Sequence, residues 1–259
     1  MKKLHTKKTI ISYLDRLIGI LTHRSNIVSY NDHHIYTGCM DRNSLVIDLG
    51  AYQGEFASKV SSSFGCRCYA IEALPDSYNT INENELIKKF NYAISKNNGP
   101  VNLYVSNRAT TTSIKKNISD AHGTKESITV EGINLEKFLE KNDIQDIDML
   151  KVDIEGAEIE MFNSISDNAI LRTKQITVEF HIFIDNSMED NVDAIMARLR
   201  RLGFFYMVFP VSWSNEHDCD VLFINKNRIK LTPKEKLYVF ILKHVLLKLR
   251  NILEKNNKV

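Results

Sequence analysis

Carboxylates followed by glycines close two apolar stretches of the sequence. Asp48 and Gly50 end the run LVIDLG, and Asp153 and Glu155 end the run DMLKVDIEG, in which Gly156 opens the next segment. A buried strand that ends in a carboxylate and turns through glycine into a helix is typical of a nucleotide-type cofactor site. The alternative is an ordinary strand-to-helix turn that Asp48 caps.

The spacing around Asp48 favours a cationic cofactor. A dinucleotide site needs the pattern G-x-G-x-x-G, whose backbone amides bind a pyrophosphate, whereas residues 48–54 read D-x-G-x-x-x-G. An unneutralised carboxylate at Asp48 would repel a phosphate in a partly dry crevice. S-adenosylmethionine carries a sulfonium and an ammonium and no phosphate, so its charge fits this position. The carboxylates of Asp153 and Glu155 likewise suit a cation or a metal.

A third acidic side chain, Glu72, ends the stretch RCYAIEA at residues 67–73. At the mouth of a parallel-sheet crevice, such a side chain accepts hydrogen bonds from two ribose hydroxyls. The alternative is a surface glutamate at the end of a strand. The stretch 91–94 belongs to the next strand, where it would either face an adenine ring or simply pack in the core.

The stretch QITVEFHIF at residues 175–183 holds the candidate general base. Because side chains alternate along a strand, Glu179 and His181 lie on the same face. A carboxylate beside an imidazole raises the imidazole pKa and holds its orientation, which suits removal of a proton from a hydroxyl that attacks a methyl group. The alternative is a structural histidine. His33, His34 and His217 lie in predicted loops, and the sequence identifies no partner for them.

Alternating strand and helix patterns position these residues. This alternation predicts an α/β fold with an open, mostly parallel sheet that binds its ligands at the carboxyl ends of the strands. The polar segment 106–125 is predicted to be a loop that either contacts sugar hydroxyls or is simply solvated. We expect strands at 45–49, 67–73, 91–95, 101–105, 127–130, 148–154, 175–183, 204–209 and 220–224, and helices at 75–89, 135–140, from about 157, and at 192–202.

Composition and charge set the outer bounds. The chain has 259 residues with 43% apolar content, enough for one domain with extensions. Its four cysteines lack metal-type spacing, and its N-terminal segment lacks the pattern of a signal peptide, so we expect reduced thiols and a cytoplasmic protein. Residues 1–44 carry 7 basic against 3 acidic side chains, and residues 226–259 carry 10 against 2. We therefore expect an N-terminal helical extension (1–44), a sheet domain (45–225) and a basic C-terminal helix (226–259).

The C-terminal segment is predicted to be an amphipathic helix. Residues 232–235, TPKE, have the form of a capping box with proline at the first helical position. At about 100° per residue, a charged stripe of Lys236, Lys243, Arg250 and Glu254 lies opposite an apolar face of Tyr238, Ile241, Leu242, Val245, Leu249, Ile252 and Leu253. We expect this helix to dock on its own domain or in a homodimer. The alternative is a peripheral contact with the inner face of a membrane.

Five stretches together resemble the FkbM-type family of S-adenosylmethionine-dependent methyltransferases. They are VIDLGAYQGEF (46–56), AIEALPDSY (70–78), NYAISKNNGPVNLYVS (91–106), LKVDIEGAE (150–158) and VEFH (178–181). The resemblance covers residues 45–225 and implies a Rossmann-like, seven-stranded class I methyltransferase sheet with a reversed last hairpin, to which this chain adds N-terminal and C-terminal helices. One departure is Ala73-Leu74-Pro75, where the family usually has proline directly after the glutamate.

Carried onto this chain, the resemblance also implies roles for individual residues. Taken with the strand pattern of residues 175–183, this makes His181, Glu179 and Asp153 the candidate catalytic residues. The candidate cofactor-binding residues are Asp48, Gly50, Ala51, Tyr52 and Gly54 at the methionine end, Glu72 and Ala73 at the ribose, Ala93 at the adenine, and Asp153 and Glu155 at the floor of the crevice.

The reaction that the resemblance implies is O-methylation, often of a sugar hydroxyl. We expect a methyltransferase that uses S-adenosylmethionine on a small-molecule or carbohydrate acceptor, with no nucleic-acid partner. Either His181 removes the proton, or a divalent metal such as Mg²⁺, held by some of Asp153, Glu155, Glu179 and His181, lowers the hydroxyl pKa. Two alternatives are a nucleotide- or nucleotide-sugar-binding module without chemistry, and an interaction protein that works through its terminal helices.

Overall fold

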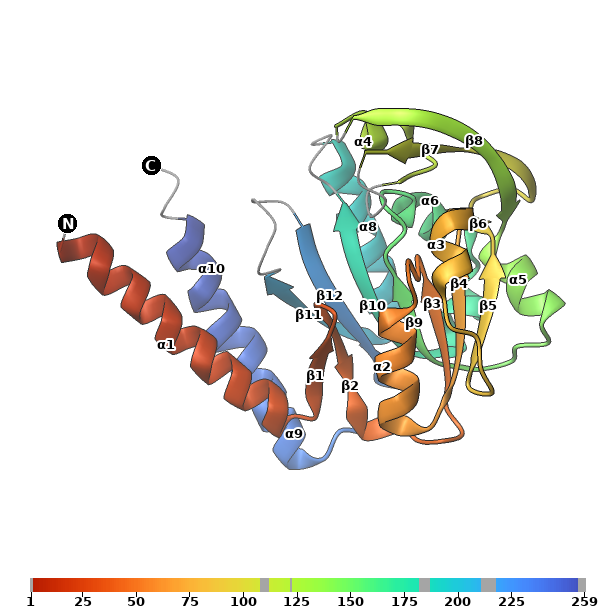
Figure 1. Cartoon of the computed structure of the whole chain (residues 1–259). Coiled ribbons are helices and arrows are strands. Elements are labelled where there is room, and N and C mark those ends of the chain that lie inside the picture. The colour runs from red at the N-terminus through yellow and green to blue at the C-terminus, as the bar shows by residue number, and fades with distance from the viewer. Residues whose placement is uncertain (1, 108–111, 122, 182–186, 211–217, 256–259) are drawn as a thin grey trace.

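A seven-stranded sheet lies at the centre of the structure, which is a computed structural model (Figure 1). The structure describes residues 2–107, 112–121, 123–181, 187–210 and 218–255. In spatial order, the strands are β11 (Phe204–Pro210), β12 (Asp218–Asn225), β10 (Thr173–His181), β9 (Ile147–Val152), β3 (Leu45–Leu49), β4 (Arg67–Glu72) and β5 (Ile87–Asn91).

The direction of the strands confirms the predicted sheet. Strands β10, β9, β3, β4 and β5 pair in parallel, so their carboxyl ends meet at one edge. Strand β12 lies between β10 and β11 and runs antiparallel to both. This is the mostly parallel α/β sheet that the alternation of strands and helices predicts, with the reversed last hairpin that the family resemblance implies.

Helices cover both faces of this sheet, which explains why its central strand is apolar throughout. All five residues of β3 are buried. On one face, α2 (Glu55–Phe64) packs Phe56 and Val60 against the sheet. On the other face, α5 (Leu135–Lys141), α6 (Glu158–Ser164), α7 (Asp167–Leu171) and α8 (Ser187–Arg201) contribute side chains to the largest apolar cluster. The core therefore lies on both sides of the strands that carry the candidate site.

A second, three-stranded sheet stands over the carboxyl ends of the central strands (Figure 1). It consists of β6 (Ala93–Ile94), β8 (Thr124–Ile133) and β7 (Gly99–Ser106), and α4 (Lys116–Ala121) connects β7 to β8. The segment 106–125, predicted to be a loop, therefore contains a short helix. Residues 108–111 and His122 of that segment lie outside the described residues.

The predicted helix at 75–89 is wrong beyond its first turns. Helix α3 is only Pro75–Thr80, and the chain then turns into strand β5. The side chain of Asn84 accepts hydrogen bonds from the backbone N–H groups of Leu86 and Ile87, which stabilises a turn in place of a helix. Ile87 is buried in the core beside α2. Burial of Ile87 in the sheet outweighs the local helical pattern.

The N-terminal extension is helical only as far as Arg24, so the predicted helical extension (1–44) needs correction. Helix α1 (Lys2–Arg24) is followed by a hairpin of β1 (Ile27–Tyr30) and β2 (His33–Tyr36), and by a short turn, η1 (Thr37–Cys39). Asn31 and Asp32 both have positive φ, at 47° and 63°. A two-residue turn with this geometry matches the twist of a hairpin and favours Asn and Asp.

The C-terminal helix begins as predicted but is interrupted. Helix α9 (Pro233–Ile241) opens with the capping box of Thr232 and Glu235, and with Pro233 at its start. A π-helical turn, η3 (Leu242–Leu246), joins it to α10 (Leu247–Lys255). Figure 1 shows these segments lying alongside α1, beyond the sheet edge formed by β11. No helix of the described part of the chain is long and apolar enough to cross a membrane.

The predicted single apolar face of this helix is wrong as well. Val239, Leu242, Leu246 and Leu247 are buried, whereas Val245, Leu249 and Ile252 are exposed. A π-helical turn takes up one more residue than an α-helical turn, and it therefore rotates the residues after it relative to those before it. The helix consequently has two apolar sides, and one of them packs on the domain.

Glu235 fastens the C-terminal helix to the N-terminal extension, which makes a pH-dependent prediction. Its carboxylate accepts hydrogen bonds from Asn26 Nδ2 at 2.7 Å, Tyr36 Oη at 2.9 Å and the backbone N–H of Thr232 at 2.7 Å. Burial raises the pKa of Glu235, but these hydrogen bonds lower it more, and the net shift is downward. The stabilisation is therefore complete above the unfolded-state pKa and is lost as the pH falls through the folded-state value.

We expect Glu235→Gln to lower the free energy of unfolding by about 1–2 kcal/mol at pH 7, because an amide donor replaces one acceptor oxygen. Urea denaturation at pH 7 and at pH 4 measures this difference, which should shrink at the lower pH. Glu126→Gln, at an exposed carboxylate of β8, is the control and should leave the stability unchanged. An equal loss for the Glu235 variant at both pH values would contradict the assignment.

Candidate active site

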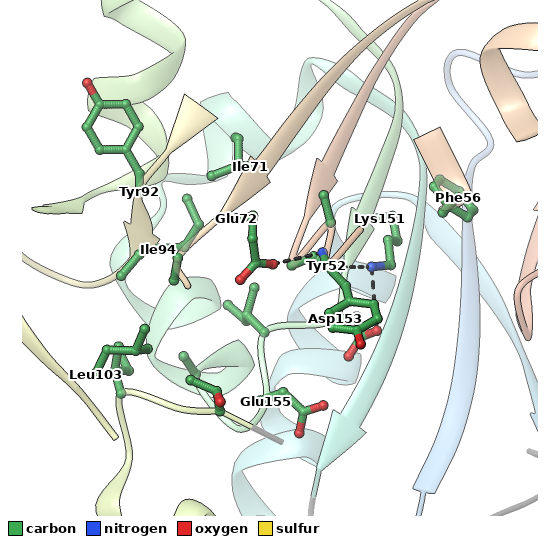
Figure 2. A pocket seen from close by; sticks show the side chains of 18 of the residues that line it. Tyr52, Phe56, Ile71, Glu72, Tyr92, Ile94, Leu103, Lys151, Asp153 and Glu155 are labelled. Carbon is green, nitrogen blue, oxygen red and sulfur yellow. Dashed lines mark hydrogen bonds and ion pairs between the residues drawn. The ribbon is translucent and has the colours of Figure 1, made fainter. Parts of the chain in front are cut away.

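An open cavity with about 1010 Å³ of empty space lies at the carboxyl ends of β3, β4 and β9 (Figure 2). It is lined by the loop after β3, the end of β4, the segment around β6 and the loop after β9. Of the predicted cofactor-binding residues, those that line the cavity are Gly50, Ala51, Tyr52, Glu72, Ala73, Ala93, Asp153 and Glu155. Asp48 and Gly54 are not among the lining residues. The cavity thus brings together most of the predicted set.

Gly50 allows the loops after β3 and β9 to touch. Its φ is 76°, and a Cβ atom at this position would lie 1.7 Å from the backbone oxygen of Asp153. The N–H groups of Gly50 and Ala51 both donate to the carbonyl oxygen of Ile71 at the end of β4. Glycine is therefore required here by space as well as by backbone conformation. The role of Gly54 differs from the predicted contact with the cofactor. Its missing Cβ leaves room for the side chain of Ile81.

Glu72 is held in place by two backbone groups. Its two carboxylate oxygens accept hydrogen bonds from the N–H groups of Tyr52 and Leu74, both at 2.8 Å. Tyr52 has a positive φ of 49°, an unfavourable conformation for a side chain of its size, and it aims this N–H at Glu72. Burial raises the pKa of Glu72 although both hydrogen bonds lower it. Each oxygen keeps a lone pair for a further donor, as a ribose-binding carboxylate needs.

Asp48 is paired inside the protein, which corrects the prediction of an unneutralised carboxylate facing the cofactor. Asp48 is fully buried, and its Oδ1 lies 3.1 Å from Nζ of Lys151. The two residues are register partners on the neighbouring strands β3 and β9. Lys151 also donates to the carbonyl oxygen of Gly50 at 2.7 Å and lies 3.5 Å from Oδ2 of Asp153. Burial lowers the pKa of Lys151, but Asp48 and Asp153 raise it far more.

A signal for Lys151 is nevertheless present in the sequence. A lysine in the otherwise apolar strand MLKV requires a buried partner, because lysine is almost never fully buried unless it is paired. The adjacent parallel strand offers Asp48 at the same level. The predicted site residues do not include Lys151, although this signal could have found it.

His33 and His34 do not lie in the predicted loops, and both have partners that the sequence did not identify. Both are on strand β2. His33 is buried, with Nε2 3.4 Å from Oδ2 of Asp153 and Nδ1 3.8 Å from Oδ1 of Asp220. His34 Nδ1 lies 2.7 Å from Oδ2 of Asp220. Burial lowers the pKa of His33, but the neighbouring carboxylates of Asp153 and Asp220 raise it to about 9.

The predicted base, His181, lies behind the cavity lining. Its side chain is 7% exposed. Its Nδ1 is 3.0 Å from Oε1 of Glu158, and its Nε2 is 3.4 Å from Oε2 of Glu155 and 3.8 Å from Oδ1 of Asp153. Burial lowers its pKa, whereas the charges of Glu158 and Glu155 raise it well above the usual value. The hydrogen bond to Nδ1 involves Glu158, which the sequence did not single out, whereas Glu179 is the residue predicted to orient this imidazole.

Glu155 is the acidic side chain that meets the cavity in front of His181. It lines the cavity beside Asp153, as Figure 2 shows, and its side chain is 20% exposed. Its φ of 52° is unusual for a glutamate. Burial raises the pKa of Glu155 well above the usual value, and the charge of His181 lowers it only in part. An ionised carboxylate in such surroundings is a stronger proton acceptor than one in water.

The comparison with known protein families decides the identity of this domain. A family model described as the methyltransferase FkbM domain matches residues 48–206, more than half of the chain. The chain belongs to the FkbM methyltransferase family. The FkbM domain is an S-adenosylmethionine-dependent methyltransferase domain, and its matched residues span the sheet from β3 into β11. His33, from the N-terminal extension, and Asp220, from β12, lie outside the match and nevertheless contact the site.

Two curated proteins are similar to parts of this FkbM methyltransferase. Hexuronic acid methyltransferase AglP of Haloferax volcanii is 23% identical over 150 residues, which are 56% of this chain and 59% of AglP. AMB antimetabolite synthetase AmbE of Pseudomonas aeruginosa is 31% identical over 70 residues, which are 27% of this chain and 3% of AmbE. The matched regions thus span less than two thirds of the length of either relative.

Solved structures similar to the FkbM methyltransferase chain include two that contain the cofactor or its product. Fibrillarin of Aeropyrum pernix with bound S-adenosyl-L-methionine has a TM-score of 0.43 and 13% identity, covering 76% of this chain and 81% of that chain. TrmK of M. capricolum with S-adenosyl-homocysteine has a TM-score of 0.39 and 10% identity, covering 85% of this chain and 83% of that chain.

Within the part of the chain that the structure describes, two groups of side chains have the spacing of metal ligands. They are His33, Asp153 and Glu179, and Asp153, Glu155 and His181, with one potential ligand atom of each residue within 4.8 Å of the others. Asp153 belongs to both groups. The ammonium of Lys151 already lies 3.5 Å from Asp153, so a divalent cation there would stand beside a fixed positive charge.

The buried pair of Lys151 and Asp48 makes a prediction about stability. Lys151→Met would leave the carboxylate of Asp48 buried without a cation, so we expect a loss of about 3–5 kcal/mol in the free energy of unfolding. Adding Asp48→Asn removes the uncompensated charge and should recover much of that loss. Urea denaturation of the two variants measures both values.

The control for this experiment is Lys174→Met, which breaks a more exposed ion pair with Asp148. We expect that substitution to cost less than about 1 kcal/mol. A Lys151→Met variant as stable as the Lys174→Met variant would show that the buried charge of Asp48 needs no partner.

Proposed function

We propose that this FkbM methyltransferase transfers a methyl group from S-adenosylmethionine to an oxygen of a sugar, most directly a hydroxyl of a glycan precursor. The observation that carries the proposal is the position of Glu155. An acidic side chain with a raised pKa faces the same cavity as the loop that Glu72 anchors. The relative AglP is a hexuronic acid methyltransferase, which supports a sugar as the acceptor.

The residues of the cavity fit S-adenosylmethionine. Glu72 offers free lone pairs to ribose hydroxyls, and Ala73 and Ala93 leave space beside it for the adenine. Asp153 also lines the cavity, and its carboxylate, which the charges of Lys151 and His33 keep ionised, suits the sulfonium and the ammonium. The cofactor supplies the activated methyl group. Asp48 contributes indirectly, because it holds Lys151 and thereby the loop of Gly50.

In the proposed reaction the chain has two tasks. The first is alignment, since methyl transfer requires the acceptor oxygen, the methyl carbon and the sulfur to lie in line near contact distance. The second is to receive the hydroxyl proton, which Glu155 takes up at Oε1 or Oε2 while His181 stays behind it. This scheme adds Glu155, as the group that touches the acceptor, to the predicted catalytic residues His181, Glu179 and Asp153.

The nature of the acceptor is tested with labelled S-adenosylmethionine and a panel of hexose and hexuronic acid glycosides. A sugar hydroxyl gives a methyl ether, which survives mild alkali, whereas a carboxylate gives a methyl ester, which does not. We expect an alkali-stable product. Release of the label by alkali would show that the methyl group is transferred to the carboxylate. A lack of transfer to any of the glycosides would contradict a sugar as the acceptor.

The roles of Glu155 and His181 are tested with separate binding and turnover measurements. We expect Glu155→Gln to lower kcat by about a hundredfold or more and to leave the Kd for S-adenosylmethionine within about twofold. His181→Asn should also lower kcat, because Glu155 loses its charged neighbour. Glu131→Gln, at an exposed carboxylate of β8 that does not line the cavity, is the matched control.

These assays are run with and without EDTA, which separates proton transfer to Glu155 from the metal route. We expect equal activity in both, because Lys151 already supplies a cation next to Asp153. Loss of activity in EDTA with recovery on addition of Mg²⁺ would establish the metal route instead. Tight binding of S-adenosylmethionine without any methyl transfer would favour the binding-module alternative.

A further inference from the structure

The terminal helices carry an unusual surface. Among the residues that the structure describes, the large apolar side chains that are exposed all lie on these helices. On α1 they are Ile10, Tyr13, Leu17 and Ile20, and on α9 to α10 they are Leu237, Phe240, Val245, Leu249 and Ile252. Tyr13 is 67% exposed and Phe240 is 58% exposed. Exposed apolar side chains gathered in this way mark an interaction surface, whereas scattered ones do not.

The π-helical turn η3 makes the apolar surface of the C-terminal helix continuous. In an uninterrupted α-helix, at about 100° per residue, Val245 would point about 110° away from the midline of Leu237 and Phe240. The extra residue taken up by the π turn rotates Val245, Leu249 and Ile252 back by about one residue, into line with the first two. We call these five side chains the outer stripe. Leu242 and Leu247, on the opposite side, stay buried in the domain.

The surface around the outer stripe is basic. Residues 226–259 contain ten Lys or Arg and two Asp or Glu. One of the two acids, Glu235, is buried under the capping box, where its carboxylate is already bound. Lys236 and Lys248 are exposed, and by the same helical geometry they fall on one flank of the stripe. On α1, the acidic side chain of Asp15 is paired with Arg250 at 2.6 Å.

We propose that the outer stripe and its basic flank bind the surface of a membrane rich in anionic lipids, with the helix lying in the plane of the interface. An apolar stripe beside lysines on a helix that cannot span the bilayer has the chemistry of such a contact. A second copy of the chain fits the stripe less well, because two basic flanks would be brought together. No residue of α1, α9, η3 or α10 lines the cavity, so this contact leaves the cavity free.

The 259-residue chain is tested by flotation with two kinds of vesicle, one of phosphatidylcholine alone and one with added phosphatidylglycerol. We expect binding to the anionic vesicles that is at least about tenfold stronger than to the neutral ones, and that weakens at high salt. Equal binding to both vesicles, or binding to neither, would overturn the proposal. The inference does not depend on the acceptor, so methyl transfer to a soluble glycoside need not change in any variant.

Two double variants separate the contribution of the apolar outer stripe from that of its basic flank. Phe240→Asp with Leu249→Asp removes apolar contacts and should reduce vesicle binding at least about tenfold. Lys236→Glu with Lys248→Glu should abolish the preference for anionic lipid. The control Lys137→Glu makes the same change in net charge as the first variant, but at an exposed position of α5 with a 58% exposed side chain, and should bind as the native chain does.

Sedimentation velocity without vesicles tests whether a second copy of the chain covers the outer stripe instead of a membrane. We expect a monomer at concentrations at which vesicle binding is complete. A dimer that the Phe240→Asp, Leu249→Asp variant dissociates would assign the outer stripe to a second copy and overturn the membrane proposal. Circular dichroism of each variant checks that the helices remain folded. Since all four substituted side chains are exposed, we expect no change.

Discussion

A single buried ammonium group, that of Lys151, holds the candidate site together. It contacts the carboxylate of Asp48 on β3, the backbone oxygen of Gly50 in the loop after β3, and the carboxylate of Asp153 in the loop after β9. Taking one cation and two carboxylates out of water is costly, and such a group is stable only when the charges are close and the remaining donors are used. The position of the cavity loops is therefore coupled to the pairing of β3 with β9. A change in that register would separate Asp48 from Lys151.

The N-terminal hairpin completes this arrangement from outside the FkbM match. Strand β2 places His33 against Asp153, while Asp220 of β12 accepts hydrogen bonds from the backbone N–H of His34 and from Thr177 of β10. The hairpin thereby joins the reversed end of the sheet to the site at its centre. His33, which the family match leaves in an extension, thus contacts the candidate site. This explains why the first 44 residues include a strand pair in addition to a helix.

The sequence predicted those features that depend on local pattern and on the order of elements. The strand that contains Asp48, the glycine turn after it and the capping box at Thr232 follow from short-range chemistry, whereas the reversed last hairpin was implied by the family resemblance. The structure contains each of them. The sequence did not predict partners across the sheet. Glu158 and His181 are 23 residues apart in sequence, and His33 and Asp153 are 120 apart. Likewise, a constant period of about 100° per residue could not reveal the π turn after Ile241, because that turn breaks the period itself.

Three carboxylates in the motif from Asp153 to Glu158 lie in different electrostatic surroundings. Burial raises the pKa of Asp153, but Lys151 and His33 lower it far more, so it stays ionised. Glu158 accepts hydrogen bonds from the N–H groups of Ile154 and Gly156, which fixes the loop, and it also holds His181. Glu155, between them in sequence, lies against the imidazole of His181, and burial raises its pKa. Opposite pKa shifts in neighbouring carboxylates separate a permanent charge from a proton acceptor. In the proposed mechanism, one short loop therefore holds its own shape through Glu158, supplies a fixed anion through Asp153 and presents Glu155 as the base.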